Sequence, residues 1–340
     1  MFSRFLRLVR RTSGNQGATS NAPTADLPWL SRESIAHLLV TEEDLPHVDW
    51  GMAEAWIEHQ SAPEQAEMSA ADLHRAIAAA WLDELRDALA TDSRRWRTAQ
   101  VEGLAPLEGN IGPRAAAAAD RSLRVIGEAL REIRGEPRNN PIPPIGIVAL
   151  GTHEEYYSFI ARFYADEDEY ATSGGLYIRS TAEEFPVLAI AAQATFAIEE
   201  TMAHELTHHA FAPDRPELGH LPMWVEEGLA QMMEEYVTRA PRFVFDREIL
   251  ERHQALWLEI GLDGFASGES FHSPEGEEQE LSYNLAEALT RSLATTRRAD
   301  FFAFVRACRN ERQDHELAAR EHLGGTVEEL AESMISSKTH

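Results

Sequence analysis

The sequence contains a single cysteine, Cys308, among its 340 residues. One cysteine excludes an intrachain disulfide and a cysteine-rich zinc site. The residue lies in the stretch FFAFVRACRN, whose apolar residues have the spacing of a helix. We therefore interpret Cys308 as a core residue rather than a redox group.

Basic residues are also scarce, and the sequence has no long apolar run. Lys and Arg number 31 against 57 Asp and Glu, which gives a net charge of −26. A surface that binds nucleic acid has to be basic to displace counterions, so we expect no nucleic-acid partner and no docking on an anionic membrane. Spanning a bilayer takes about 18 consecutive apolar residues, so the sequence predicts no integral membrane segment.

The N-terminal stretch MFSRFLRLVRR has arginines inserted among its apolar residues. A cleavable secretion signal has an uninterrupted apolar segment, so this pattern favours a cytoplasmic protein. The stretch could form a short amphipathic helix that touches a membrane weakly, or it could be a frayed tail. Because residues 12–28 are small, polar and turn-prone, we predict a disordered or amphipathic tail over 1–28.

The following region, 29–137, is predicted to be mainly helical. In its best segment, 68–89, Ser69 is a candidate N-cap. The apolar residues of this segment recur at helical spacing, at Leu73, Ile77, Trp81, Leu85 and Leu89. Residues 94–110 resemble a short strand with turns on either side, and 114–134 an alanine-rich helix.

After a proline-rich break at 135–144 the pattern changes. The stretches IGIVAL, SGGLYIRS and FPVLAIAAQ predict three strands, and HEEYYSFIARFY predicts a helix after the first strand. Further helices are expected beyond them, with a Gly/Ser/Glu-rich loop at 261–280 and a capping box formed by Thr326 and Glu329 at the last helix. The sequence therefore predicts an α+β fold with a domain over 138–340.

The motif HELTH at 204–208 carries the clearest chemistry. On a helix, positions i and i+4 share a face with Cβ atoms roughly 5–6 Å apart, so His204 and His208 can reach one metal ion. Neutral imidazole is a good zinc ligand, and catalytic zinc sites use three protein ligands plus water. Glu205 lies next to the first histidine, where it can act as general base on a metal-bound water.

A second helix is predicted over residues 222–236, PMWVEEGLAQMMEEY, with Pro222 in its first turn. Eighteen residues separate His208 from Glu227. A turn between two antiparallel helices can bring that carboxylate back to the histidines. Gly228 would let the backbone pack closely at this point.

An HExxH motif followed by eighteen residues and a glutamate in a W-x-x-E-G-x-A setting resembles the gluzincin metallopeptidases. The spacing matches the aminopeptidase N family, and the residues around the motif are similar to those of peptidase-MA-like domains. The specific match covers residues 195–228. The resemblance implies a zincin-like domain, one Zn²⁺ held by His204, His208 and Glu227, Glu205 as the base, and a peptide or protein substrate.

Other residues compete for these roles. Asp214 occupies the ligand position of the metzincin pattern, although Phe211 replaces the turn glycine of that pattern. His209 points about 100° away from His208 around the helix, which predicts a supporting or surface position. His220 could line the cleft or lie in a solvated loop. The side chain of Glu226 should point away from the metal.

The resemblance also bears on the substrate. The glycines of SGGLY at 173–177 fit an edge strand that pairs with an extended substrate, or an ordinary turn that begins a strand. The Gly-x-Met-Glu-Asn motif with which the aminopeptidase N family grips a substrate's amino terminus has no match, which favours an endopeptidase. Gluzincins often place a tyrosine near the metal to donate to the oxyanion. Tyr283, at the predicted start of a helix, is the candidate, and His272 is the weaker alternative.

Two functions follow from these features. The first is a zinc-dependent hydrolase, in the first place a peptidase. The alternative is a zincin fold that binds or regulates without turnover. The intact set of HExxH and Glu227 favours the enzyme, since a decayed site would be free to lose any of these residues. The sequence gives no indication of the oligomeric state.

Overall fold

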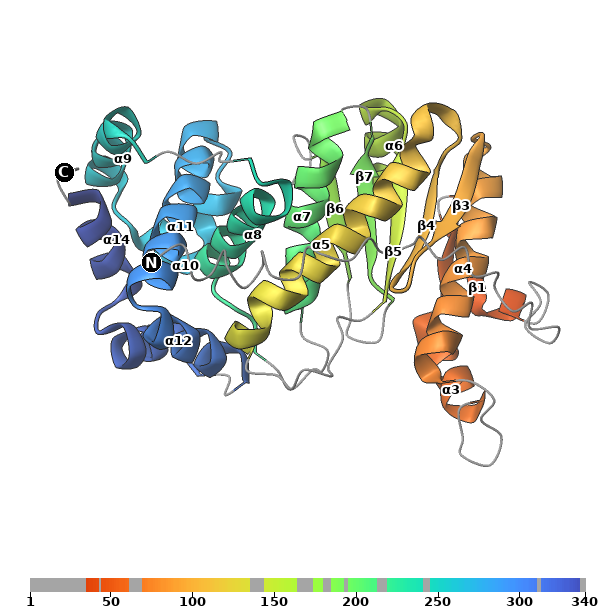
Figure 1. Ribbon diagram of the computed structural model, residues 1–340, viewed down its shortest axis with the longest axis horizontal. Coiled ribbons are helices and arrows are strands. Elements are labelled where there is room, and N and C mark those ends of the chain that lie inside the picture. Colours follow the sequence, from red (N-terminus) through yellow and green to blue (C-terminus); the bar gives the residue numbers. More distant parts are fainter. Residues whose placement is uncertain are drawn as a thin grey trace. The chain divides into compact units, whose positions relative to one another are not determined.

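The computed structural model describes residues 35–42, 44–60, 69–134, 144–163, 174–179, 185–192, 195–212, 219–240, 245–310 and 313–336. The predicted tail over 1–28 and the competing ligand Asp214 lie outside these ranges. Two compact units are formed: one contains a sheet and lies within Asn15–Leu123 and Ile142–His209, and the other lies mainly within Ala210–His340. Many helices and one mixed sheet make the fold α+β, as the sequence predicted (Figure 1).

The sheet has five strands in the order β3-β4-β5-β7-β6. Its three central strands are parallel to one another, and β3 and β6 pair antiparallel at the two edges. The bounds are β3 Ser93–Arg97, β4 Val101–Pro106, β5 Ile145–Leu150, β6 Gly175–Ile178 and β7 Val187–Ala191. The three strands predicted after the proline-rich break are thereby confirmed.

Residues 94–110 form a hairpin, β3 and β4, where one strand was predicted. Trp96 of β3 lies over Gly103 of β4 so closely that a Cβ atom at Gly103 would be 2.0 Å from the indole. All but the last residue of β4 are buried, so its sequence lacks the alternation that marks a half-buried strand. The alanine-rich helix that follows, α5 (Ile111–Arg134), is confirmed.

The N-terminal part is less helical than predicted, because β1 (Leu39–Glu42) and β2 (Leu45–Val48) form a two-stranded hairpin. Their sequences, LVTE and LPHV, do not alternate apolar and polar residues, so they carry no strand signal. Helices α3 (Trp50–Gln60) and α4 (Ala70–Leu89) follow. Ser69 caps α4 as predicted, since its hydroxyl accepts a hydrogen bond from the Asp72 amide at 3.2 Å.

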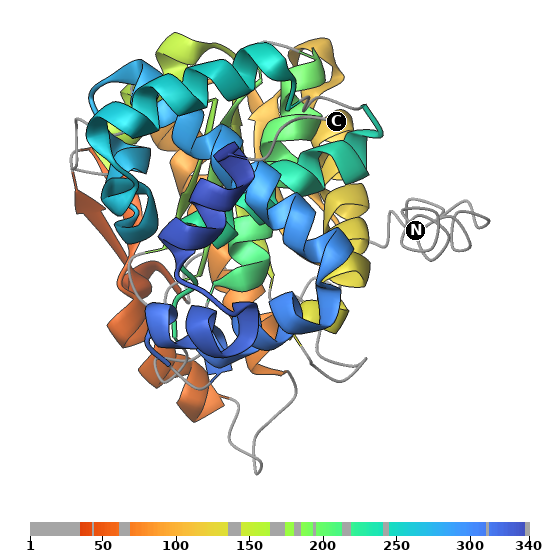
Figure 2. The ribbon, with the colours of Figure 1, turned by 90° about the vertical axis from the view of Figure 1, so that its left-hand side faces the viewer.

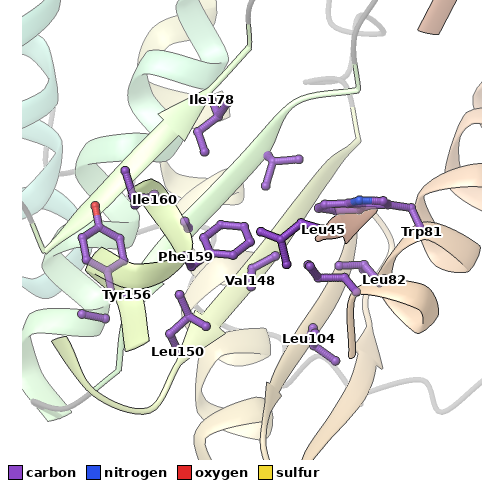
Figure 3. Close-up of a cluster of buried hydrophobic side chains, with 14 residues drawn as sticks. Leu45, Trp81, Leu82, Leu104, Val148, Leu150, Tyr156, Phe159, Ile160 and Ile178 are labelled. Atoms are coloured by element: carbon purple, nitrogen blue, oxygen red, sulfur yellow. The ribbon is translucent and has the colours of Figure 1, made fainter. Parts of the chain in front are cut away.

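Helices α4 and α6 (His153–Phe163) pack on one face of the sheet. Figure 3 shows the resulting cluster, in which Phe159 of α6 and Leu82 of α4 lie against Val148 of β5. The indole nitrogen of Trp81 donates to the carbonyl of Pro46 at 2.7 Å, so this large side chain is buried without losing its hydrogen bond. Successive residues of a strand face opposite sides, which leaves Gly175 and Tyr177 of β6 on the other face.

The other unit consists of helices (Figure 2). They are α8 Met223–Thr238, α9 Arg247–Ile260, α10 Asp263–Ser267, η3 Glu269–His272, α11 Gly276–Thr296, α12 Arg298–Asn310, α13 His315–Ala318, η4 Ala319–Leu323 and α14 Val327–Ser336. Thr326 and Glu329 form the predicted capping box, with hydrogen bonds of 2.8 and 3.0 Å between the side chain of each and the amide of the other. Cys308 is buried, and this burial raises the pKa of its thiol to about 12, in keeping with a core role.

Helix α11 begins at Gly276, inside the stretch predicted as a loop. Glu277 and Glu278 occupy its first turn, where carboxylates interact favourably with the helix dipole, so the acidic run was a helix start rather than a loop. Tyr283 consequently lies inside the helix and not at its beginning. Among the described helices, none combines the length and apolarity needed to cross a membrane.

Candidate metal centre

The HELTH motif lies within α7 (Thr195–Phe211), which is the predicted helix. Met202, Ala203 and Leu206 are buried, whereas His204, Glu205 and His208 keep part of their surface exposed. The ring centroids of His204 and His208 are 5.0 Å apart. One face of the helix thus presents both imidazoles side by side.

Glu227 lies on α8, which begins directly after Pro222. Its side chain is 7% exposed, whereas that of Glu226 is only half-buried. At the next residue, a Cβ atom on Gly228 would be 2.3 Å from Thr290 Oγ1 and 2.5 Å from the carbonyl oxygen of Ala286. The predicted close packing at Gly228 is therefore present, and its partner is α11.

Ion pairs reinforce the contact between α8 and α11. Arg291 of α11 donates to Glu235 of α8 at 2.9 Å and also pairs with Glu287 one turn earlier on its own helix. Glu287 is 5% exposed, and desolvation by this burial raises the pKa of its carboxyl group. Arg291 thus joins two carboxylates and ties α11 to the helix that carries Glu227.

The three predicted ligands come together. His204, His208 and Glu227 each offer one ligand atom, and these atoms all lie within 4.8 Å of one another. Two imidazole nitrogens and one carboxylate oxygen are a donor set that transition metals such as zinc accept. The group could therefore hold a metal ion.

Glu205 contacts the sheet. Its Oε2 atom accepts a hydrogen bond from the backbone amide of Tyr177 in β6 at 3.1 Å. The sequence contained no signal for this contact, because the donor is a main-chain group 28 residues earlier in the chain. The candidate base is thus hydrogen-bonded to the edge strand β6, and it directly follows the candidate ligand His204 in the sequence.

The two other histidines near the motif differ from each other. His209 is only 1% exposed, and its Nδ1 atom lies 3.4 Å from the hydroxyl of Tyr177, so the surface alternative for this residue is wrong. His220 is exposed in the segment before α8, and its carbonyl oxygen is 3.0 Å from His315 Nε2. This agrees with a surface position for His220.

Tyr283 is held in place by the helical unit. Its ring contacts Phe271 edge-to-face with centroids 5.3 Å apart, and its carbonyl accepts a hydrogen bond from Gln231 of α8 at 3.0 Å. His272 ends the short segment η3. The participation of either side chain in chemistry stays a prediction.

Comparison with models of protein families found no match, and comparison with curated protein sequences found none either.

Proposed function

We propose that this protein is a zinc-dependent hydrolase, and that its substrates are peptides or proteins cleaved internally. The observation that carries the proposal is the group formed by His204, His208 and Glu227, whose ligand atoms all lie within 4.8 Å. Catalytic zinc sites use three protein ligands and leave the fourth position to water or substrate. Here Glu205 adds a carboxylate that is adjacent in sequence to the ligand His204. A structural zinc site would normally use four protein ligands instead.

A bound zinc ion would supply Lewis acidity, which polarises a carbonyl group and lowers the pKa of water towards about 7. Glu205 would take the proton from the attacking water and deliver it to the leaving amine, which is general acid–base work for one carboxylate. The phenol of Tyr283 is our candidate donor to the developing oxyanion.

The zincin-like domain and the relation to gluzincins belong to the same proposal. Support comes from the order of the elements: an edge strand, β6, precedes β7 and the motif helix α7, and helix α8 with Glu227 follows. The absence of the aminopeptidase motif from the sequence supports endopeptidase over aminopeptidase activity.

The proposal is tested by incubating the zinc-loaded protein with a library of unmodified peptides and reading cleavage by mass spectrometry. Glu205→Gln should bind zinc as the wild type does and lose cleavage by about a thousandfold or more, because the general base is removed. Glu200→Gln, on the same helix, is the matched control and should retain cleavage. Zinc binding without cleavage of any peptide by the wild type would favour the non-catalytic alternative.

A further inference from the structure

Strand β6 is the last strand at one side of the five-stranded sheet. Among the described strands, β6 pairs with β7 alone, and Gly174 accepts a hydrogen bond from Ala191 on that side at 2.9 Å. In an antiparallel pair, residues along a strand direct their backbone groups alternately towards and away from the partner. The amide of Tyr177 points away from β7, and it donates to Glu205 Oε2.

Strand β6 and helix α7 also approach each other closely at Gly175. A Cβ atom at Gly175 would lie 2.3 Å from Cγ2 of Thr201, which is closer than any non-bonded carbon atoms approach. Thr201 precedes Glu205 by four residues, so the two side chains share one face of the helix. The missing side chain at position 175 therefore leaves the space that Thr201 occupies.

A third contact lies one turn further along α7. His209 follows Glu205 by four residues, and its Nδ1 atom is 3.4 Å from the hydroxyl of Tyr177. The two rings are tilted, with centroids 5.6 Å apart. Tyr177 thus meets α7 twice, with its backbone at Glu205 and with its side chain at the buried His209.

We infer that Gly175 and Tyr177 of strand β6 are positioning residues for Glu205: the missing side chain of Gly175 sets the distance between helix and strand, and the Tyr177 amide orients the carboxylate. A hydrogen bond to a charged acceptor is directional and about twice as strong as a neutral one, so it fixes the rotamer of Glu205. The role of Glu205 as base rests on the proposed function, whereas the contact with β6 does not.

The first experiment measures the Tyr177 amide directly in full-length, ¹⁵N-labelled and deuterated protein without added metal. Glu205→Ala should shift the Tyr177 amide proton upfield and speed its hydrogen exchange by roughly tenfold or more, because its acceptor is lost. Glu205→Gln keeps an acceptor oxygen but makes it neutral, so both observables should lie between those of Glu205→Ala and the wild type. An unchanged Tyr177 amide in Glu205→Ala would overturn the inference, and this variant removes no packing contact at Gly175.

The second experiment tests the distance between helix and strand with a double-mutant cycle. Gly175→Ala should move the Tyr177 amide proton upfield, as Glu205→Ala does, because the new methyl group collides with Thr201 Cγ2. Thr201→Ser deletes that Cγ2 atom and retains the hydroxyl. The double variant should therefore recover the wild-type resonance. Failure of Thr201→Ser to restore it would contradict the proposed fit, even if Gly175→Ala alone proved unstable.

The two proposals fail separately. If peptide cleavage follows the Tyr177 resonance across these variants, lost in Gly175→Ala and recovered in the double variant, the positioning role is supported. If the resonance behaves as expected while the zinc-loaded wild type cleaves nothing, the hydrolase proposal fails and the contact between β6 and Glu205 stands. If cleavage is unaffected by Gly175→Ala while the resonance is lost, the positioning role is contradicted.

Discussion

Two glycines, Gly175 and Gly228, lie beside the two parts of the candidate site and admit different kinds of neighbour. At Gly175 an added Cβ would meet a side-chain methyl group of Thr201, 2.3 Å away. At Gly228 it would meet Thr290 Oγ1 at 2.3 Å and, in addition, the backbone oxygen of Ala286 at 2.5 Å. A side chain can be shortened by a second substitution, but a helix carbonyl cannot. The packing around α7, which carries the histidines, should therefore tolerate substitution better than the packing around α8, which carries Glu227.

The largest effect is expected at Gly228. Gly228→Ala should destabilise the protein by about 3 kcal/mol, since α8 and α11 have to separate to accommodate the methyl group. Adding Thr290→Ala, which removes the Oγ1 atom, should recover little, because the Ala286 carbonyl oxygen remains 2.5 Å from the added Cβ. Urea unfolding of the single and double variants measures both values. Full recovery in the double variant would show that the backbone contact is unimportant.

A smaller loss of stability, about 2 kcal/mol at pH 7, is expected for Arg291→Met, which removes the hydrogen-bonded cation of the buried Glu287 carboxylate. Burial raises the pKa of Glu287, so its ionised form opposes folding at neutral pH. As the pH falls through that raised value the carboxyl group becomes neutral, and the loss should shrink. Unfolding curves of variant and wild type at pH 7 and pH 5 test this sign. A loss that grows towards low pH would be inconsistent with it.

Gly175→Ala should lower the free energy of unfolding by less, about 1.5 kcal/mol, because the atom that it meets is the terminal methyl group of Thr201. Adding Thr201→Ser should return most of that stability in thermal or urea unfolding, in contrast to the pair at Gly228. Equal behaviour of the two double variants would remove the distinction between the two glycines.

The smallest effect should come from the capping box at the last helix. Thr326→Ala removes the acceptor of the Glu329 amide, which is worth about 1 kcal/mol. Zinc binding should be unchanged. This variant is therefore a control in which stability falls while the candidate metal centre is left intact. A parallel loss of zinc would mean that global stability, and not local geometry, governs the metal affinity of the other variants.

Local signals in the sequence predicted much of this molecule. Ser69 and Thr326 were identified as caps from residue type and spacing, and both caps are present. The strands at 145–150, 175–178 and 187–191 were visible as apolar runs bounded by turn residues. The grouping of His204 and His208 follows from helix periodicity alone, because both residues lie on one helix.

The features that escaped prediction depend on contacts between distant segments. The bond from the Tyr177 amide to Glu205 uses a main-chain donor, which has no residue signature. The hairpin β3–β4 was missed because burial of nearly all of β4 removes the alternation of a strand. The start of α11 was read as a loop, since glycine, serine and glutamate occur in loops as well as in the first turn of a helix.

Elemental analysis of zinc in the purified protein is the decisive measurement for the metal centre. Wild type, Glu227→Ala and the matched control Glu226→Ala are compared after equal exposure to zinc. We expect one zinc per chain in the wild type and in Glu226→Ala, and little or none in Glu227→Ala. No zinc in a folded wild type, even after titration, would contradict the metal centre and the hydrolase built on it. Zinc retained in Glu227→Ala would contradict Glu227 as the third ligand.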